Sequence, residues 1–130
     1  MNAKKNLEEL SNDEISISGV DIVNVEYYVG NTLFEQPSSS DEVLISVEID
    51  SDNPIDVQLY YGTGLTGRFE RVSMNYSFAT DRYTYSISPQ NSGEYVRFYV
   101  ETIASNGSRT YSPEGAEHNI YIYEVKMDAL

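Results

Sequence analysis

The side chains that could carry out chemistry are few in this sequence of 130 residues. His118 is the single histidine, and it lies in a polar stretch between Glu117 and Asn119. A Ser-His-Asp triad would have to use His118, yet no Gly-x-Ser-x-Gly elbow is present. Cysteine is absent, which excludes thiolate chemistry and a cysteine-based metal site. We therefore interpret His118 as a solvated loop residue and expect a non-catalytic protein.

Three glycines have the spacing of the dinucleotide-binding fingerprint, namely Gly62, Gly64 and Gly67. That fingerprint binds a pyrophosphate where it follows a strand and opens a helix. Here the glycines follow a strand pattern but lead into residues 68–74, which also have the pattern of a strand. We interpret them as the connection of a hairpin, and we expect no nucleotide cofactor.

An acidic turn is the candidate metal site. Asp50, Asp52 and Asn53 lie together just before Pro54, and oxygen ligands at alternating positions suit a hard cation such as calcium. The glycine and the terminal glutamate of an EF-hand loop are missing. Asp and Asn before proline are also ordinary turn formers, and this second interpretation is the stronger one.

Tyrosine offers the candidate ligand-binding surface, because the chain has 12 Tyr and no Trp. Tyr60 and Tyr99 fall on the outward positions of two predicted strands, and Tyr28 or Tyr27 could join them. Exposed aromatic rings on a sheet can stack on sugar rings. The alternative is that these tyrosines cover neighbouring strands across the pleat, and the lack of Trp favours that alternative.

The charge excludes several classes of partner. The net charge is -13, from 21 acidic and 8 basic residues. Binding to a nucleic acid backbone needs clustered Lys and Arg, and anionic membrane surfaces are disfavoured for the same reason. No apolar run is long enough to span a bilayer. We expect no nucleic acid and no membrane as partners.

One stretch organises the predicted fold. In residues 95–104, Val96, Phe98, Val100 and Thr102 alternate with Arg97, Tyr99 and Glu101. A period of two with β-branched and aromatic residues indicates a strand that is buried on one face. Asn and Gly in residues 105–108 then predict a tight turn. Residues 109–112 should form the partner strand of a hairpin, which Pro113 ends.

The rest of the chain adds further short strands and no convincing helix. They are predicted at residues 15–28, 42–50, 55–61, 68–74, 82–87 and 119–125, with loops at 32–41 and 75–81. Seven to eight short strands separated by turns are typical of an all-β antiparallel sandwich. Residues 1–14 are polar and are predicted to be a linker or tail, and residues 15–130 a single β-sandwich domain.

An ordered set of strand segments also resembles a known family. The segments are 43–50, 57–61, 72–74, 85–87, 96–102, Asn106-Gly107 and 111–113. Together they are similar to the immunoglobulin-like or fibronectin type III-like accessory modules of secreted bacterial multidomain hydrolases. The resemblance covers roughly residues 20–125. The chain departs from the family pattern at Thr102, where a small alanine is common, and in its acidity. It also lacks the buried Trp and the Cys pair of antibody-type domains.

The resemblance implies a non-catalytic accessory module of a secreted or surface bacterial protein. Such a module would be extracellular, with its secretion signal outside this sequence. It would act as a spacer or protein-interaction element beside a neighbouring domain or another protein. The alternative is a carbohydrate-binding module that stacks a polysaccharide on exposed tyrosines, with calcium as a support. A small hydrolase is the remotest hypothesis.

Overall fold

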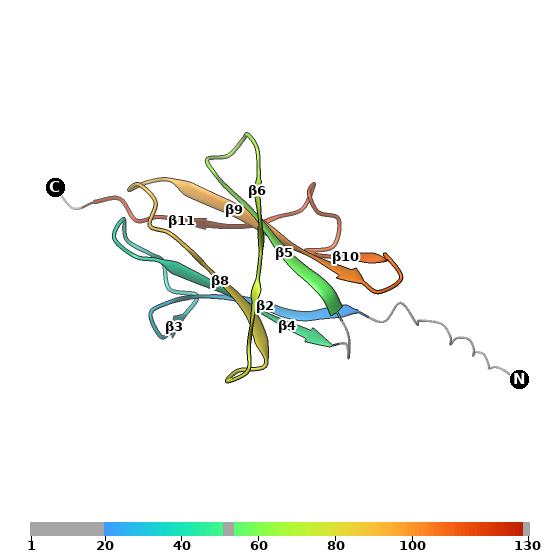
Figure 1. Cartoon of the computed structure of the whole chain (residues 1–130). Coiled ribbons are helices and arrows are strands. Elements are labelled where there is room, and N and C mark those ends of the chain that lie inside the picture. The colour runs from blue at the N-terminus through green and yellow to red at the C-terminus, as the bar shows by residue number, and fades with distance from the viewer. Residues whose placement is uncertain (1–19, 51–53, 129–130) are drawn as a thin grey trace, which may run out of the picture.

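The protein is a sandwich of two antiparallel β-sheets (Figure 1). The computed structural model describes residues 20–50 and 54–128, and this part of the chain contains strands and turns without a helix. No helix in it is therefore long and apolar enough to cross a membrane. The predicted all-β, two-layer architecture is confirmed.

Each sheet contains five of the described strands. The first, which we call the β4 sheet, has the order β3 (Thr32–Leu33), β2 (Asp21–Val29), β4 (Val43–Asp50), β8 (Arg82–Ile87), β7 (Asn75–Ser77). The second, the β9 sheet, has the order β10 (Arg109–Ser112), β9 (Tyr95–Ala104), β5 (Pro54–Thr63), β6 (Glu70–Ser73), and β11 (Tyr121–Glu124) also pairs with β9.

The core lies between the sheets because each central strand turns its aliphatic side inward. β4 contributes Val43, Ile45 and Val47, which are all buried, and the inward side of β8 ends in buried Ile87. The β9 sheet and the residue that follows β11 face them with buried apolar residues of their own, namely Val57, Leu59, Val96, Phe98, Val100, Tyr123 and Val125. The predicted alternation of inward residues on these strands is confirmed.

The predicted hairpin is present and anchors the β9 sheet. β9 pairs with β10 from Arg109 opposite Ile103 to Ser112 opposite Val100. Gly107 has a positive φ of 85° in the turn, which is a conformation that glycine adopts without steric cost. β11 pairs with the first half of β9, while β5 runs along its whole opposite edge.

The prediction that β9 is buried on one face only is wrong. On its outward side Arg97 is 7% exposed, Tyr99 6% and Glu101 2%. The connection from β5 to β6 covers this side, because the Arg97 guanidinium donates hydrogen bonds to the carbonyl oxygens of Gly64, Thr66 and Gly67. A polar and aromatic layer therefore lies over the outward face of the β9 sheet.

The two short strands β3 and β7 lie where loops were predicted, so the described residues contain ten strands, counting these two. β3 has two residues and β7 three, and tertiary pairing with β2 and β8 fixes them, which local patterns cannot show. The predicted tail at residues 1–14, and Ile15 and Ile17 of the first predicted strand, lie outside the described residues.

The described chain enters and leaves the sandwich at opposite ends (Figure 1). The carbonyl of Val20 accepts a hydrogen bond from the Thr110 hydroxyl, near the end of β9. Val125 bonds to the backbone of Glu94, just before β9 begins. Thr110 pairs with Thr102, so eight residue steps along β9 separate these two places, which corresponds to roughly 26 Å at ~3.3 Å per residue.

Candidate functional site

Two of the predicted ligand-binding tyrosines meet on the outward face of the β9 sheet. Tyr60 of β5 lies directly opposite Tyr99 of β9. Their rings stack with a centroid distance of 4.5 Å and an interplanar angle of 6°. Phe69 packs its edge on Tyr99 at 5.1 Å. The prediction that Tyr60 and Tyr99 share an outward face is therefore supported by their positions.

The same stacking leaves little ring surface for a ligand. One face of each ring covers the other, and Tyr99 is buried. Burial, together with the nearby Glu117 carboxylate, raises the pKa of Tyr99 to about 12. A shallow hollow of about 440 Å³ remains beside the pair, lined by Tyr60, Gly67, Arg68, Phe69, Tyr99 and Glu117.

Glu101 is the polar centre of this face. Its carboxylate accepts hydrogen bonds from the hydroxyls of Tyr60 at 3.0 Å and Tyr111 at 2.9 Å, and from the Arg109 guanidinium at 2.8 Å. Burial raises the pKa of Glu101, but these three hydrogen bonds and the charge of Arg109 outweigh that effect and leave the pKa below its usual value. One carboxylate thus joins β5, β9 and β10.

Arg97 forms a second cluster on the same face. Its guanidinium lies 4.6 Å from the centroid of the Phe69 ring, in a cation–π contact. It also holds the backbone of the glycine connection, as described above. Gly64 and Gly67 lie in the hairpin connection between β5 and β6, as predicted, whereas Gly62 is still part of β5 and pairs with Arg97.

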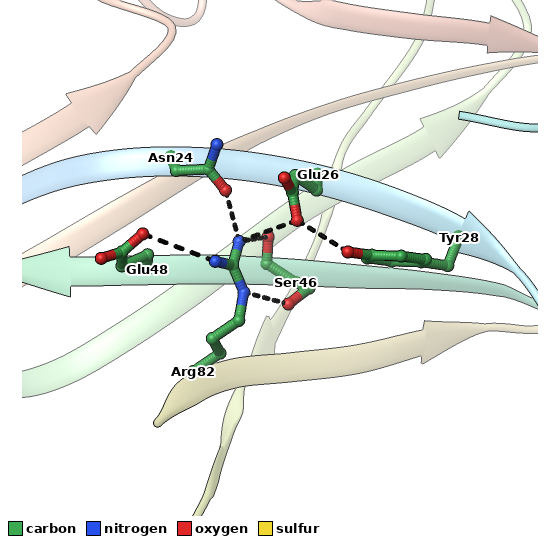
Figure 2. A network of polar contacts seen from close by, with 6 residues as sticks. All are labelled: Asn24, Glu26, Tyr28, Ser46, Glu48 and Arg82. Carbon is green, nitrogen blue, oxygen red and sulfur yellow. Dashed lines mark hydrogen bonds and ion pairs between the residues drawn. The ribbon is translucent and has the colours of Figure 1, made fainter. Parts of the chain in front are cut away.

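The outward face of the β4 sheet is organised by Arg82. Figure 2 shows its guanidinium reaching from β8 across β4 towards β2. It donates to the Ser46 hydroxyl at 2.6 Å and to the Ser46 carbonyl at 3.1 Å. It also bonds to the Asn24 side chain and forms ion pairs with Glu26 at 3.4 Å and Glu48 at 3.5 Å.

Tyr28, the third predicted ligand-binding tyrosine, belongs to this second face. Its hydroxyl donates to Glu26 at 2.9 Å (Figure 2), and this hydrogen bond is the main cause that raises the pKa of Tyr28. Tyr28 is thus on the opposite side of the sandwich from Tyr60 and Tyr99, and the three cannot form one binding surface. A hollow of about 360 Å³ lies beside Tyr28. The sequence does not predict it, because its lining residues come from segments that are distant in the sequence. They are Tyr28, Gly30, Asn31, Leu44, Ser46, Ser77, Thr80, Arg82 and Thr84.

Only part of the predicted calcium turn is described. Asp50 is exposed at the end of β4, opposite Asp21 of β2, while Asp52 and Asn53 lie outside the described residues. Within residues 20–50 and 54–128, no three His, Asp or Glu side chains gather closely enough to hold a metal ion. The calcium site therefore stays a prediction.

His118 lies in the exposed connection between β10 and β11, as predicted. A scan of protein-family models and a search of the curated proteins found no match to the chain.

Proposed function

We propose that the protein is a non-catalytic accessory module, a rigid spacer or protein-interaction element, of a secreted or surface protein. The observation that carries this proposal is the use of its charged side chains. Glu101 and Arg82 each connect three strands, and Arg97 connects β9 to the β5–β6 connection. Groups that could have served chemistry are instead committed to holding strands together.

The connectivity supports an immunoglobulin-like or fibronectin type III-like assignment. β2, β4 and β8 share one sheet, while β6, β5, β9 and β10 share the other. The chain therefore crosses between sheets after β4, after β6 and after β8, as it does in sandwiches of that class. We propose this finer classification on the strand order alone.

The places where the described chain enters and leaves the sandwich support a spacer between two neighbouring domains. A spacer transmits position best when its neighbours attach at opposite ends, and here Val20 and Val125 lie near opposite ends of β9 (Figure 1). The cross-strand contacts of Glu101, Arg97 and Arg82 resist sliding of the strands that lie between those ends.

Fluorescence energy transfer tests the spacer role directly. The chain has no cysteine, so the double variant Asp21→Cys, Met127→Cys places two labels at exposed positions near the two ends. We expect one narrow distance distribution, unchanged when a folded domain is fused to either terminus and unchanged by denaturant below the unfolding transition. A broad distribution, or a distance that changes with the fused domain, would contradict a rigid spacer.

A further inference from the structure

The hollow beside Tyr28 has the composition of a small-ligand site. Its volume of about 360 Å³ lies within the ~300–1,000 Å³ of typical pockets. Half-buried Tyr28 and Leu44, which face each other across β2 and β4, supply the apolar part of its lining. The rest is polar and comes from β4, β7, β8 and the turns next to β3 and β7.

The hydroxyl groups of this hollow are available to a ligand. Ser77, Thr80 and Thr84 all line the hollow, and their hydroxyls have no hydrogen-bond partner among the described residues. The side-chain amide of Asn31, which also lines the hollow, likewise has no hydrogen-bond partner among the described residues. Four small neutral donor and acceptor groups thus line the same hollow as an aromatic ring.

The floor of the hollow is ordered before any ligand arrives. Arg82 is fixed by Asn24, Ser46, Glu26 and Glu48 (Figure 2). Ser46 is buried and accepts a hydrogen bond from Arg82, so its own proton remains available. Pre-ordered polar groups reduce the entropy that a ligand must lose on binding.

The charge of the hollow selects the class of ligand. Arg82 is the only basic residue among its lining residues, and two carboxylates already compensate it. An anionic ligand would therefore meet Glu26 and Glu48 without gaining a free cation. A neutral ligand with both hydroxyl groups and apolar C–H faces matches a tyrosine ring surrounded by hydroxyls.

We propose that the outward face of the β4 sheet binds a neutral saccharide chain, with Tyr28 as the stacking ring and Ser46, Ser77, Thr80 and Thr84 as hydrogen-bonding groups. The opposite face is less suitable because Tyr60 and Tyr99 cover one another. This proposal is independent of the spacer role, since a module can hold its neighbours apart whether or not it binds a sugar.

Affinity electrophoresis of the full chain tests the proposal, with soluble xylan, galactomannan, mixed-linkage β-glucan or anionic polygalacturonate in the gel. We expect at least one neutral polysaccharide to retard the protein. Tyr28→Ala should weaken that binding by about ten-fold or more, because a ring loses its apolar contact. Thr84→Val keeps the shape of the side chain and removes one hydroxyl, so it should weaken binding by about three- to ten-fold.

Tyr95→Ala is the matched control, because it removes a partly exposed tyrosine from the other sheet and should leave retardation unchanged. Thermal unfolding shows whether each variant is folded. If Tyr28→Ala does not fold, the retardation of Thr84→Val tests the saccharide site by itself. The proposal is overturned if no neutral polysaccharide retards the wild-type chain, if polygalacturonate alone does, or if Thr84→Val and folded Tyr28→Ala bind like the wild type.

Discussion

Replacing Thr102 by valine should stabilise the protein. Thr102 is completely buried near the C-terminal end of β9, and its hydroxyl oxygen has no hydrogen-bond partner among the described residues. It lies between Val57 on β5 and Thr110 on β10, so a ligand or partner is not expected to reach it. Valine has the same shape and replaces the buried hydroxyl with a methyl group.

The expected gain follows from the cost of the buried hydroxyl. Burying a hydroxyl without a partner costs about 1–3 kcal/mol in proteins, and valine is also favourable in a strand. Taking the low end, we expect Thr102→Val to raise the free energy of unfolding by about 1 kcal/mol. For a domain of this size that corresponds to a rise in Tm of about 4 °C.

The neighbouring threonine provides a control with the opposite expected sign. The Thr110 hydroxyl donates a hydrogen bond to the Val20 carbonyl at 3.1 Å. Thr110→Val removes this bond and should lower the free energy of unfolding by about 0.5–1.5 kcal/mol. Urea unfolding followed by circular dichroism, with equal m-values for all three proteins, measures both changes.

A Thr102→Val variant that is less stable than the wild type would refute this reasoning. Such a result would mean that the hydroxyl is satisfied by a buried water molecule, which the substitution would leave without a partner. A loss as large as that of Thr110→Val would show that both hydroxyls contribute in the same way.

Three further predictions concern Glu101, Gly62 and the acidic turn. Because the folded pKa of Glu101 lies below its usual value of 4.5, its stabilisation is present above about pH 4.5 and is lost as the pH falls through the folded pKa. Glu101→Gln should therefore lower the free energy of unfolding, measured with urea, by about 2–4 kcal/mol at pH 6 and by less at pH 3. A difference between variant and wild type that does not change with pH would contradict this. Gly62→Ala should cost about 1–3 kcal/mol, because its Cβ would lie 2.6 Å from the Arg68 carbonyl oxygen; unchanged stability would show that the connection yields freely. Millimolar calcium should raise Tm if Asp50 binds it with Asp52 and Asn53, and an unchanged Tm would exclude that site.

The sequence predicts the inward side of the sandwich well, because apolar and polar residues alternate along each strand and the apolar side is the one that is buried. Val43, Ile45 and Val47 on one strand, and Val96, Phe98 and Val100 on another, are buried as their period indicates. The turn at Asn106-Gly107 is equally local, since it depends on backbone conformations that few residues adopt.

The outward faces were harder to predict because distant segments decide them. Alternation alone places Arg97 and Glu101 in solvent, whereas the glycine connection and Tyr60 and Tyr111 cover them. Alternation also cannot say which sheet a strand joins, so Tyr28 and Tyr60 looked like neighbours although they lie on opposite sides. The hollow beside Tyr28 depends on six separate segments and has no local signature.

The Glu101 carboxylate has a consequence for how the strands choose their partners. The aliphatic residues of β5 and β9 repeat every second position, so a slip of two residues would keep them facing the core. After such a slip in one direction, Tyr60 would stand opposite Arg97 instead of Tyr99, and its hydroxyl would move away from Glu101. The buried Glu101 carboxylate would then lose one hydrogen-bond donor, which costs free energy. Apolar packing between β5 and β9 alone would not produce this cost. Glu101 therefore disfavours this misaligned pairing of β5 with β9.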